Sequence, residues 1–290
     1  MGILLGLLTA LSWGGSDFLA RFATHRIGAL RTMFYMQFTG LILLTVFLPW
    51  LGGWGHLSDG SGWQPWAWGA LAGIINAFSS LTLYRSFEIG KMAVVAPLSA
   101  SYPVLTVLLS LLSGEHLRTA RAIGIVCTLI GVVLVAGGEK TPEDHDAEGL
   151  RRSGKGIGLA LCSAIGFGLL FWLLGTYVVP RTGAAQAVWL IRLTSSTLTA
   201  VLILAVRKSI KPPLDRVGGW ILGMGLMDTG AFVMNNFGMQ LEQIAIVSVL
   251  ASLYGAVTVG LAAIFLREHV SRWQWLGIVS IFAGIFLISR

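Results

Sequence analysis

Three ionisable side chains lie inside long apolar segments of this sequence: Asp17, Arg192 and Asp228. A charge at the centre of a membrane helix costs about 2.5–3.5 kcal/mol on insertion scales, so each is a candidate functional residue. Asp17 would lie about five residues, or roughly 7 Å, from the end of its predicted helix, where it could reach the surface and pair with Arg21. Arg192 and Asp228 would lie deeper, and could form a structural ion pair or meet a zwitterionic substrate.

Neutral polar residues accompany these charges. Asn76 and Ser80 lie one helical turn apart, and Asn235 follows Asp228 by two turns. Interhelical hydrogen bonding, worth about 0.6 kcal/mol per contact in membranes, is the alternative to substrate binding. Aromatic residues recur in the same segments: Trp13, Tyr84, Tyr102, Phe167, Phe171, Trp172 and Tyr254. They predict an aromatic-lined, mostly uncharged cavity for a substrate with an apolar body and a polar head, or for a lipophilic cation.

The apolar stretch 93–112 is interrupted by Pro97 and Pro103. Proline removes a backbone donor and clashes with the carbonyl four residues before it, so the sequence predicts a broken helix. In lipid, such a break is tolerated only against protein or water. We therefore expect the polar residues of this stretch to face a cavity: Ser99, Ser101 and Tyr102. The alternative is a kinked packing helix whose hydroxyl groups bond its own backbone.

The composition is that of a membrane protein in contact with lipid. Hydrophobic residues make up 55% of the chain and charged residues 11%, whereas soluble domains contain about 25% charged residues. The 37 glycines suit close helix packing in lipid. The net charge of +7 lies mostly in short loops, and indicates topology rather than nucleic-acid binding. Cys127 and Cys162 have no Cys or His companions, so we expect no disulfide, metal site or cofactor.

A helix of about 20 apolar residues crosses the hydrocarbon core, and the sequence predicts an all-α, polytopic membrane protein with ten such helices. The expected spans are 2–22, 29–50, 66–86, 92–112, 118–137, 156–178, 185–206, 217–238, 244–265 and 273–289. The first lacks a basic n-region and an evident cleavage site, so we interpret it as a spanning helix rather than a signal peptide. The polar stretch 139–155 is interpreted as a linker between the units 1–138 and 156–290.

The two units resemble one another in sequence. A shift of 154 residues aligns Gly14 with Gly168, and a shift of 153 aligns residues 114–117 with residues 267–270. Five helices per unit is an odd number, so the second unit would enter the membrane from the opposite side. Such inverted repeats create a site near the membrane midplane at their interface, as in many secondary transporters.

Lysine and arginine are distributed unevenly over the predicted loops. Fifteen lie on one side and four on the other, with Arg192 inside a helix. The positive-inside rule therefore places residues 138–155 in the cytoplasm, and residues 51–65 and both termini outside. The loop 51–65 contains no Lys or Arg. Aromatic residues that suit the membrane interface lie within the loop near its edges or close beside it: Trp50, Trp54, Trp63, Trp66 and Trp68.

Enzyme signatures are missing from the sequence. It contains no GxxxxGK[ST] nucleotide loop, no HExxH zinc motif and no GxSxG nucleophile elbow. We therefore expect neither an ATP-driven pump nor an intramembrane protease, and no enzyme activity.

Together these features resemble the EamA-type branch of the drug/metabolite transporter superfamily. The resemblance covers essentially the whole chain. It is carried by the ten predicted helices in two inverted five-helix repeats, the LSWG sequence at 11–14, the Tyr102-Pro103 pair, and Gly114-Glu115 with the matching pair Arg267-Glu268 in the second repeat. It implies a cavity formed mainly by helices 1, 3, 4, 6, 8 and 9, and helix bundles that rock to give alternating access.

Bacterial exporters of aromatic and other neutral amino acids are the most similar members, with an aromatic residue before the fourth-helix proline, here Tyr102, and another in the sixth helix, here Phe167. Two departures stand out. Gly255 and Ala256 occupy positions where many members have a proline, and members commonly have cytoplasmic termini, which disagrees with the charge count.

From these observations we expect a multi-pass exporter in the bacterial inner membrane. It would carry amino acids, with aromatic or neutral ones favoured, or related small metabolites, by alternating access. A multidrug or lipophilic-cation exporter and a non-transporting structural or sensory subunit are the alternatives. The sequence leaves the oligomeric state open, with a monomer as the working expectation.

The residues expected to bind substrate are Trp13, Asp17, Asn76, Ser80, Ser99, Tyr102, Phe167, Phe171, Asp228, Asn235 and Tyr254. Asp17 or Asp228 would couple protons or the substrate ammonium to the cycle, because the pKa of a carboxyl group depends on its burial and on nearby charge. A neighbouring Arg192 would hold Asp228 ionised. We therefore favour Asp17 as the titrating group.

Overall fold

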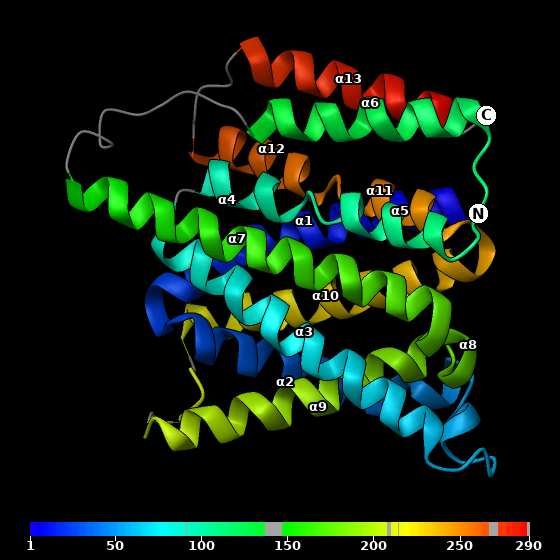
Figure 1. Ribbon diagram of the computed structural model, residues 1–290. Helices are drawn as coiled ribbons and strands as arrows, with labels where there is room; N and C mark the ends of the chain where they lie inside the picture. The colour runs from blue at the N-terminus through cyan, green and yellow to red at the C-terminus, as the bar shows by residue number, and fades with distance from the viewer. Residues whose placement is uncertain (91, 137–146, 208–209, 214, 267–271, 289–290) are drawn as a thin grey trace.

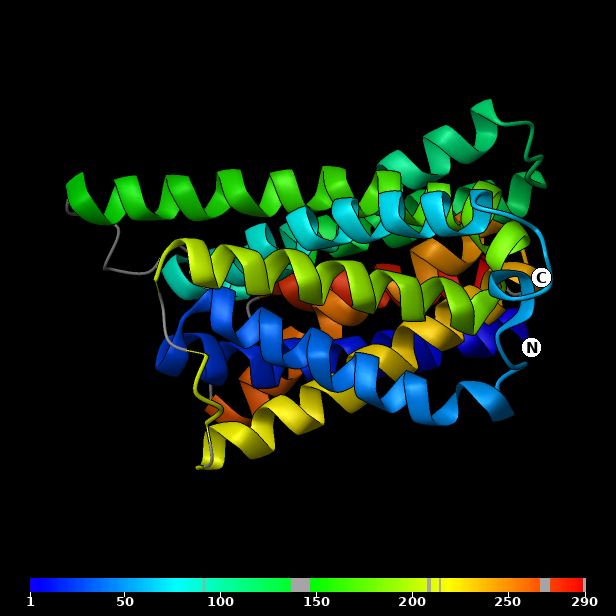
Figure 2. The ribbon, with the colours of Figure 1, turned by 90° about the horizontal axis from the view of Figure 1, so that it is seen from below.

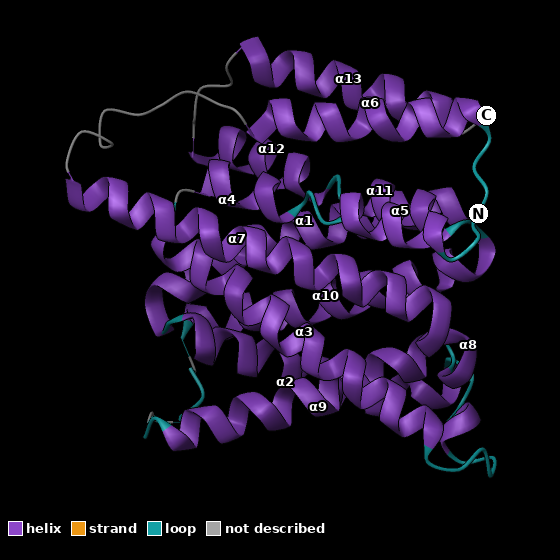
Figure 3. Cartoon of the chain, viewed as in Figure 1, coloured by secondary structure: helices purple, strands orange, loops and turns teal. Residues whose placement is uncertain are grey.

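The computed structural model describes residues 1–290 except 91, 137–146, 208–209, 214, 267–271 and 289–290 (Figure 1). This part of the chain is helical and contains no strand (Figure 3). Within it, seven helical segments are long and apolar enough to cross a membrane. The prediction of an all-α, multi-pass membrane protein is therefore confirmed, and the count of ten spans stays a prediction.

The first half of the chain contains α1 (Gly2–Ile27), α2 (Ala29–Phe47), the short turns η1 (Leu48–Trp50) and η2 (Gly55–Leu57), α3 (Gln64–Ile89), α4 (Met92–Ser99), α5 (Pro103–Leu112) and α6 (Thr119–Ala136). Gly28 separates α1 from α2 with φ 80°, a left-handed conformation that glycine adopts without strain. Pro65 lies in the first turn of α3, where its missing N–H is harmless.

The second half contains α7 (Ala147–Leu173), the π-helical turn η4 (Leu174–Val178), α8 (Val179–Thr182), α9 (Ala184–Ala205), α10 (Arg216–Leu241), α11 (Ile244–Ala251), α12 (Tyr254–Leu266) and α13 (Arg272–Ile288). Gly183, with φ 97°, separates α8 from α9 as Gly28 separates α1 from α2. Asp215 caps α10, because its carboxylate accepts the Val217 N–H at 3.1 Å.

Two helices, α1 and α7, extend five or more residues beyond their predicted ends, whereas α3 and α10 extend three residues past theirs. The first continues to Ile27 rather than ending at residue 22, because no proline or glycine interrupts it before Gly28. α7 begins at Ala147, so part of the stretch predicted as a linker is helical. Six of the nine residues 147–155, one Ala, one Glu, one Leu, two Arg and one Lys, have high helix propensity. The rest of the predicted linker, residues 139–146, lies outside the described residues.

The segment 93–112 forms two helices, as predicted, and the break separates Ser99 from Pro103. Pro103 begins α5, where a missing N–H costs nothing. The segment predicted as one helix over 244–265 is also broken, between Ala251 and Tyr254, although it contains no proline.

The helices cross between the two halves of the chain. α1 packs on α10, α11 and α12 from the second half, whereas α7 packs on α3, α4 and α5 from the first half. α2 packs on α9 (Figures 1 and 2), and α6 pairs with α13 at one edge of the molecule (Figure 1). The N-terminus lies at the same end of the helices as the end of α13 and the loop between α2 and α3. Residues from both halves therefore line the centre.

Candidate substrate-binding cavity

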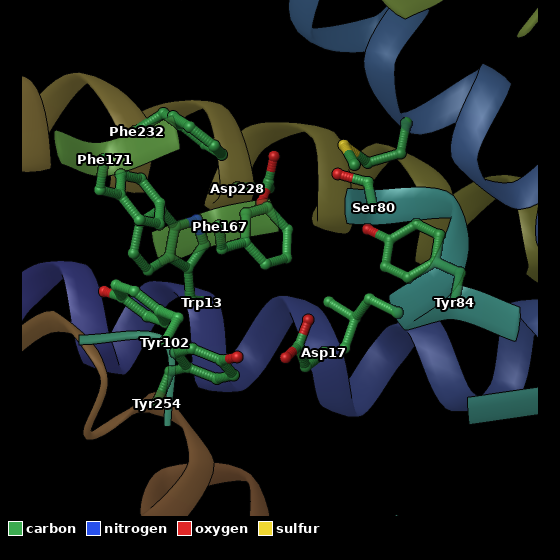
Figure 4. Close-up of a pocket in the computed structure, with 12 residues that line it drawn as sticks. Trp13, Asp17, Ser80, Tyr84, Tyr102, Phe167, Phe171, Asp228, Phe232 and Tyr254 are labelled. Carbon is green, nitrogen blue, oxygen red and sulfur yellow. The ribbon is translucent and has the colours of Figure 1, made fainter. Parts of the chain in front are cut away.

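A small cavity lies where the two broken helices meet α1, α3, α7 and α10 (Figure 4). Its volume is about 30 Å³, enough for roughly one or two water molecules. The lining residues are Trp13, Asp17, Met36, Ser80, Leu83, Tyr84, Tyr102, Phe167, Phe171, Asp228, Phe232 and Tyr254. Eight of the eleven residues expected to bind substrate are among them, so the structure brings together side chains that are far apart in the sequence.

Helical spacing explains how four helices reach this cavity. Each contributes two lining residues four positions apart, which lie on one face of a helix. The pairs are Trp13 and Asp17 on α1, Ser80 and Tyr84 on α3, Phe167 and Phe171 on α7, and Asp228 and Phe232 on α10. Tyr102 and Tyr254 come from the breaks in the two interrupted helices.

Aromatic rings pack around Trp13. Its ring centroid lies 5.3 Å from that of Phe171, 5.1 Å from that of Phe232 and 6.1 Å from that of Tyr254. Tyr102 lies 4.9 Å from Phe171 and is stacked with Tyr254 at 6.4 Å. Such rings offer apolar contact, and their faces attract cations. The cavity is therefore suited to an apolar or cationic group.

The hydroxyl groups of the two tyrosines connect the two broken helices. Tyr102 donates to the carbonyl oxygen of Ser248 on α11 at 3.0 Å. Tyr254 donates to the hydroxyl of Ser99 on α4 at 3.2 Å, and Ser99 in turn donates to the carbonyl of Ala96 at 2.9 Å. Because these bonds join segments from opposite halves of the chain, moving one broken helix requires the other to move or the bonds to break.

Arg192 and Asp228 form a buried ion pair beside the cavity. The guanidinium donates from one nitrogen to the Asp228 carboxylate at 2.5 Å and from the other to the Gln37 side-chain oxygen at 2.5 Å. It also lies 5.0 Å from the ring centroid of Phe232. Of the two alternatives left open by the sequence, the structure contains the ion pair.

Asp17 has a different environment. Its side chain is 6% exposed and lines the cavity, and within the described part of the chain its carboxylate makes no hydrogen bond or ion pair. Because α1 continues to Ile27, Asp17 lies ten residues, or about 15 Å, from the end of the helix rather than about 7 Å. Asp17 thus places a carboxylate in the interior of a membrane-spanning helix, and this carboxylate lines the same cavity as Asp228.

Comparison with known proteins identifies the family. The model of the EamA-like transporter family matches two segments, residues 1–137 and 154–290. The chain belongs to this family. It is a family of membrane transporters, which agrees with the apolar helices and with the predicted membership of the drug/metabolite transporter superfamily.

Two similar proteins give further context. An uncharacterized protein of Methanocaldococcus jannaschii is 30% identical over 136 residues, which are 46% of this chain and 95% of that relative. The relative is thus about half as long as this EamA-like chain. A solved crystal structure aligns over 99% of this chain and 95% of its own with a TM-score of 0.75 and 19% identity, so it shares the fold.

Three residues that the sequence suggested for substrate binding make structural contacts in this EamA-like transporter. Asn76 donates to the Ser195 hydroxyl at 3.1 Å between α3 and α9. The Asn235 side-chain amide lies 3.7 Å from the sulfur of Met239 on the same helix. Ser99 accepts from Tyr254. None of the three lines the cavity.

Four lining residues were absent from the predicted set. Met36 and Leu83 are apolar and carry no sequence signal for binding. Tyr84 and Phe232 do carry one, because each lies four residues after a predicted site residue, Ser80 or Asp228. The described residues also contain no cluster of three His, Cys, Asp or Glu side chains that could hold a metal ion.

Proposed function

We propose that this EamA-like transporter exports amino acids, with aromatic or neutral ones favoured, or related small metabolites, across the bacterial inner membrane by alternating access. The observation that carries the proposal is Asp17, a carboxylate without a partner in the described structure, beside the aromatic rings of the cavity. The ammonium group of a substrate would bind Asp17. Its apolar body would contact Trp13, Tyr102 and Phe167.

Matching contacts support an arrangement of ten spans in two inverted five-helix repeats. Gly14 on α1 lies against α12, and its carbonyl accepts from Thr258 at 3.3 Å. Gly168 on α7 lies against α5, and its carbonyl accepts from Thr106 at 3.0 Å. The two glycines are 154 residues apart, as in the sequence alignment of the units. The family model also matches two separate segments, and this agrees with the predicted units.

The small size of the cavity supports a transport cycle with an occluded state. A volume of about 30 Å³ holds water but not an amino acid, since ligand pockets typically measure about 300–1,000 Å³. The site must therefore widen for substrate to enter and leave. The two broken helices are suitable moving parts, because the turns that follow Ser99 and Ala251 have fewer helical hydrogen bonds to lose.

The charge distribution supports an orientation with both termini outside. A cysteine placed at Ser58, in the loop between α2 and α3, would then be accessible from outside, and one placed at His25, at the other end of α1, would not. The measurement is labelling of intact cells with an impermeant thiol reagent, in a background lacking Cys127 and Cys162. Labelling at His25 but not at Ser58 would reverse the orientation.

Counterflow in proteoliposomes tests the site. We expect Asp17→Asn to retain the fold but to exchange phenylalanine more weakly than wild type and without its pH dependence, because the variant has neither a carboxylate for the substrate ammonium nor a group that exchanges a proton. Asp228→Asn is a contrasting variant, since it leaves the Arg192 guanidinium buried without its carboxylate, and we expect a loss of stability of about 3–5 kcal/mol. Wild-type pH dependence in a folded Asp17→Asn protein contradicts the assignment of Asp17.

One observation favours a second candidate, export of lipophilic amines. The described lining residues include two carboxylates but no Lys, Arg or His, so a substrate carboxylate finds only hydroxyl and indole donors there. Counterflow of labelled phenylalanine and phenethylamine separates the two candidates, because the amine lacks the carboxylate. Exchange of phenethylamine without exchange of phenylalanine would replace the amino-acid proposal by the second one.

A further inference from the structure

A groove at the end of the helices near the 51–63 loop has no role in the cavity. Its volume is about 470 Å³, and it is lined by Trp63, Gln64, Ala67, Trp68, Leu71 and Arg181. All but Arg181 belong to the start of α3 or directly precede it, whereas Arg181 comes from α8. The groove therefore joins the first half of the chain to the second on the outer surface.

Arg181 lies over an aromatic platform in this groove. The rings of Trp68 and Tyr177 are stacked at 5.3 Å with an angle of 9° between their planes. The guanidinium carbon of Arg181 is 5.6 Å from the Trp68 centroid and 5.4 Å from the Tyr177 centroid. One guanidinium nitrogen donates to the Tyr177 carbonyl at 2.9 Å. The stacking and this bond restrict the guanidinium and leave its other donors for a ligand.

The charge of Arg181 is not neutralised within the described residues. No carboxylate lies within ion-pair distance of it there, whereas Arg121, at the same end of the molecule, is paired with Glu242 at 3.0 Å. Asp59 is the acidic residue of the 51–63 loop. Its carboxylate accepts from Ser61 and contacts His56. A planar guanidinium with free donors matches the oxygen atoms of a phosphate group.

An apolar surface continues from the groove along α3. Leu71, Ile74 and Phe78 are 42%, 52% and 57% exposed. Their spacing of three and four residues places them on one face of the helix, and this face extends from the groove toward the middle of the membrane. An acyl chain bound there would run parallel to α3. Trp63 and Trp68 lie at the start of α3, and tryptophans at the ends of membrane-spanning helices are enriched where indole rings meet lipid headgroups.

We propose that this groove binds one anionic phospholipid of the leaflet at that end of the helices. The phosphate of the lipid contacts the Arg181 guanidinium, its glycerol region lies against Gln64 and Trp68, and one acyl chain packs on Leu71 and Ile74. A phospholipid fits all three features, the unpaired cation, the interfacial indoles and the apolar face, whereas a soluble anion would use only the first. The bound lipid connects α3 with α8 and is independent of the transported substrate.

Native mass spectrometry of the purified, detergent-solubilised full chain tests the proposal. Phosphatidylglycerol or phosphatidylcholine is titrated into wild type, Arg181→Gln and Arg118→Gln. Arg118 is also exposed at this end of the molecule but does not line the groove, so it is a matched charge control. We expect the first phosphatidylglycerol to bind wild type and Arg118→Gln about tenfold more tightly than Arg181→Gln, and phosphatidylcholine to bind all three equally weakly.

Several results would overturn the proposal. Equal loss of binding in both arginine variants would mean a general charge effect, and equal binding of the two lipids to wild type would mean no recognition of the anionic headgroup. Displacement of the lipid by soluble glycerol phosphate would mean that the groove binds a free anion.

If circular dichroism shows that Arg181→Gln is unfolded, Arg181→Lys replaces it. This variant keeps the positive charge but loses the planar guanidinium and its paired hydrogen-bond donors. A lipid affinity of Arg181→Lys equal to that of wild type would contradict the stacked guanidinium as the binding group.

Discussion

The two broken helices at the cavity reach the same geometry from different sequences. The first is interrupted after Ser99 and resumes at Pro103, whereas the second is interrupted after Ala251 and resumes at Tyr254 without a proline. In both, the serine at the break donates to the carbonyl three residues earlier, Ser99 to Ala96 at 2.9 Å and Ser252 to Val249 at 2.7 Å. Proline is therefore not the common cause of the breaks.

The shared feature is contact with the opposite half of the chain. The Tyr102 hydroxyl bonds to the backbone of α11, and the Tyr254 hydroxyl bonds to Ser99 at the end of α4. α1 and α7 press on the two breaks through Gly14 and Gly168. The comparison indicates that packing between the halves makes each break, and that Pro103 only removes the competing continuous helix in the first half.

The largest expected loss of stability comes from replacing Gly14 or Gly168, the glycines at the two breaks, by alanine. A methyl group at Gly168 would lie 2.8 Å from the Tyr102 carbonyl oxygen, and one at Gly14 would lie 2.5 Å from a Val257 methyl carbon. We expect Gly168→Ala and Gly14→Ala each to cost about 1–3 kcal/mol of stability, because the Tyr102 carbonyl oxygen and the Val257 Cβ, 2.6 Å from the new methyl group at Gly14, are both fixed by the backbone.

Thermal denaturation in detergent measures these losses. Gly158→Ala is the matched control on α7, because nothing lies within 4 Å of its new methyl group. Helix propensity alone should make this control more stable by about 1 kcal/mol. Similar melting temperatures for Gly168→Ala and Gly158→Ala would remove the packing explanation of the first break.

The next largest effect, on the rate of transport, is expected from removing the proline at the first break, while a proline added near the second break should change transport little. Pro103→Ala restores a backbone donor and allows α4 and α5 to join, so we expect transport to fall about tenfold, equivalent to 1.4 kcal/mol of activation free energy, with little change in folding. Ala256→Pro places a proline in the first turn of α12, where it is tolerated, and we expect near-normal transport. Counterflow at equal protein content measures both, and full activity of Pro103→Ala would show that its proline affects packing only.

Removing single hydroxyl groups sharpens the comparison further. Tyr102→Phe leaves the Ser248 carbonyl without this donor, and Tyr254→Phe leaves the Ser99 hydroxyl without its donor. We expect each to lose about 0.5–1.5 kcal/mol of stability. The double variant tests coupling through a double-mutant cycle in thermal denaturation. Strict additivity would indicate that the two bonds act independently rather than joining the helices as one unit.

The smallest expected effect concerns the start of α11. One carboxylate oxygen of Glu115 accepts the Ala245 N–H at 3.4 Å, and burial raises the pKa of Glu115 above its usual range, with nearby Glu242 adding to the shift. A raised carboxyl pKa stabilises the fold fully at pH values below the unfolded pKa, and this contribution is lost as the pH rises through the folded pKa.

Two substitutions separate the charge of Glu115 from its role as an acceptor. We expect Glu115→Gln to keep the acceptor and to flatten the dependence of melting temperature on pH above about 4.3, the usual glutamate value. Glu115→Ala loses the acceptor, at a cost of about 0.5 kcal/mol. A wild-type pH profile in Glu115→Gln would exclude Glu115 as the titrating group. Its repeat counterpart at residue 268 lies outside the described residues.

Sequence patterns identified most of the cavity because membrane helices follow simple rules. A charge such as Asp17 is expensive in lipid, so it indicated a protected site. The four-residue spacing that joins Ser80 to Tyr84 and Asp228 to Phe232 was visible in the sequence, although it was not used to add Tyr84 and Phe232 to the site. Met36 and Leu83 could not be found in this way, because an apolar residue that faces a cavity resembles one that faces lipid.

The sequence by itself determined the apolar helices, the break before Pro103 and the deep positions of Arg192 and Asp228, because local backbone chemistry and the cost of charge in lipid act on each segment separately. Tertiary structure decided what no single segment contains. The pairing of Arg192 with Asp228, the break after Ala251 and the roles of Asn76 and Asn235 depend on which neighbour each segment meets. Polar groups in lipid must find partners, and the packing of the two halves supplies them.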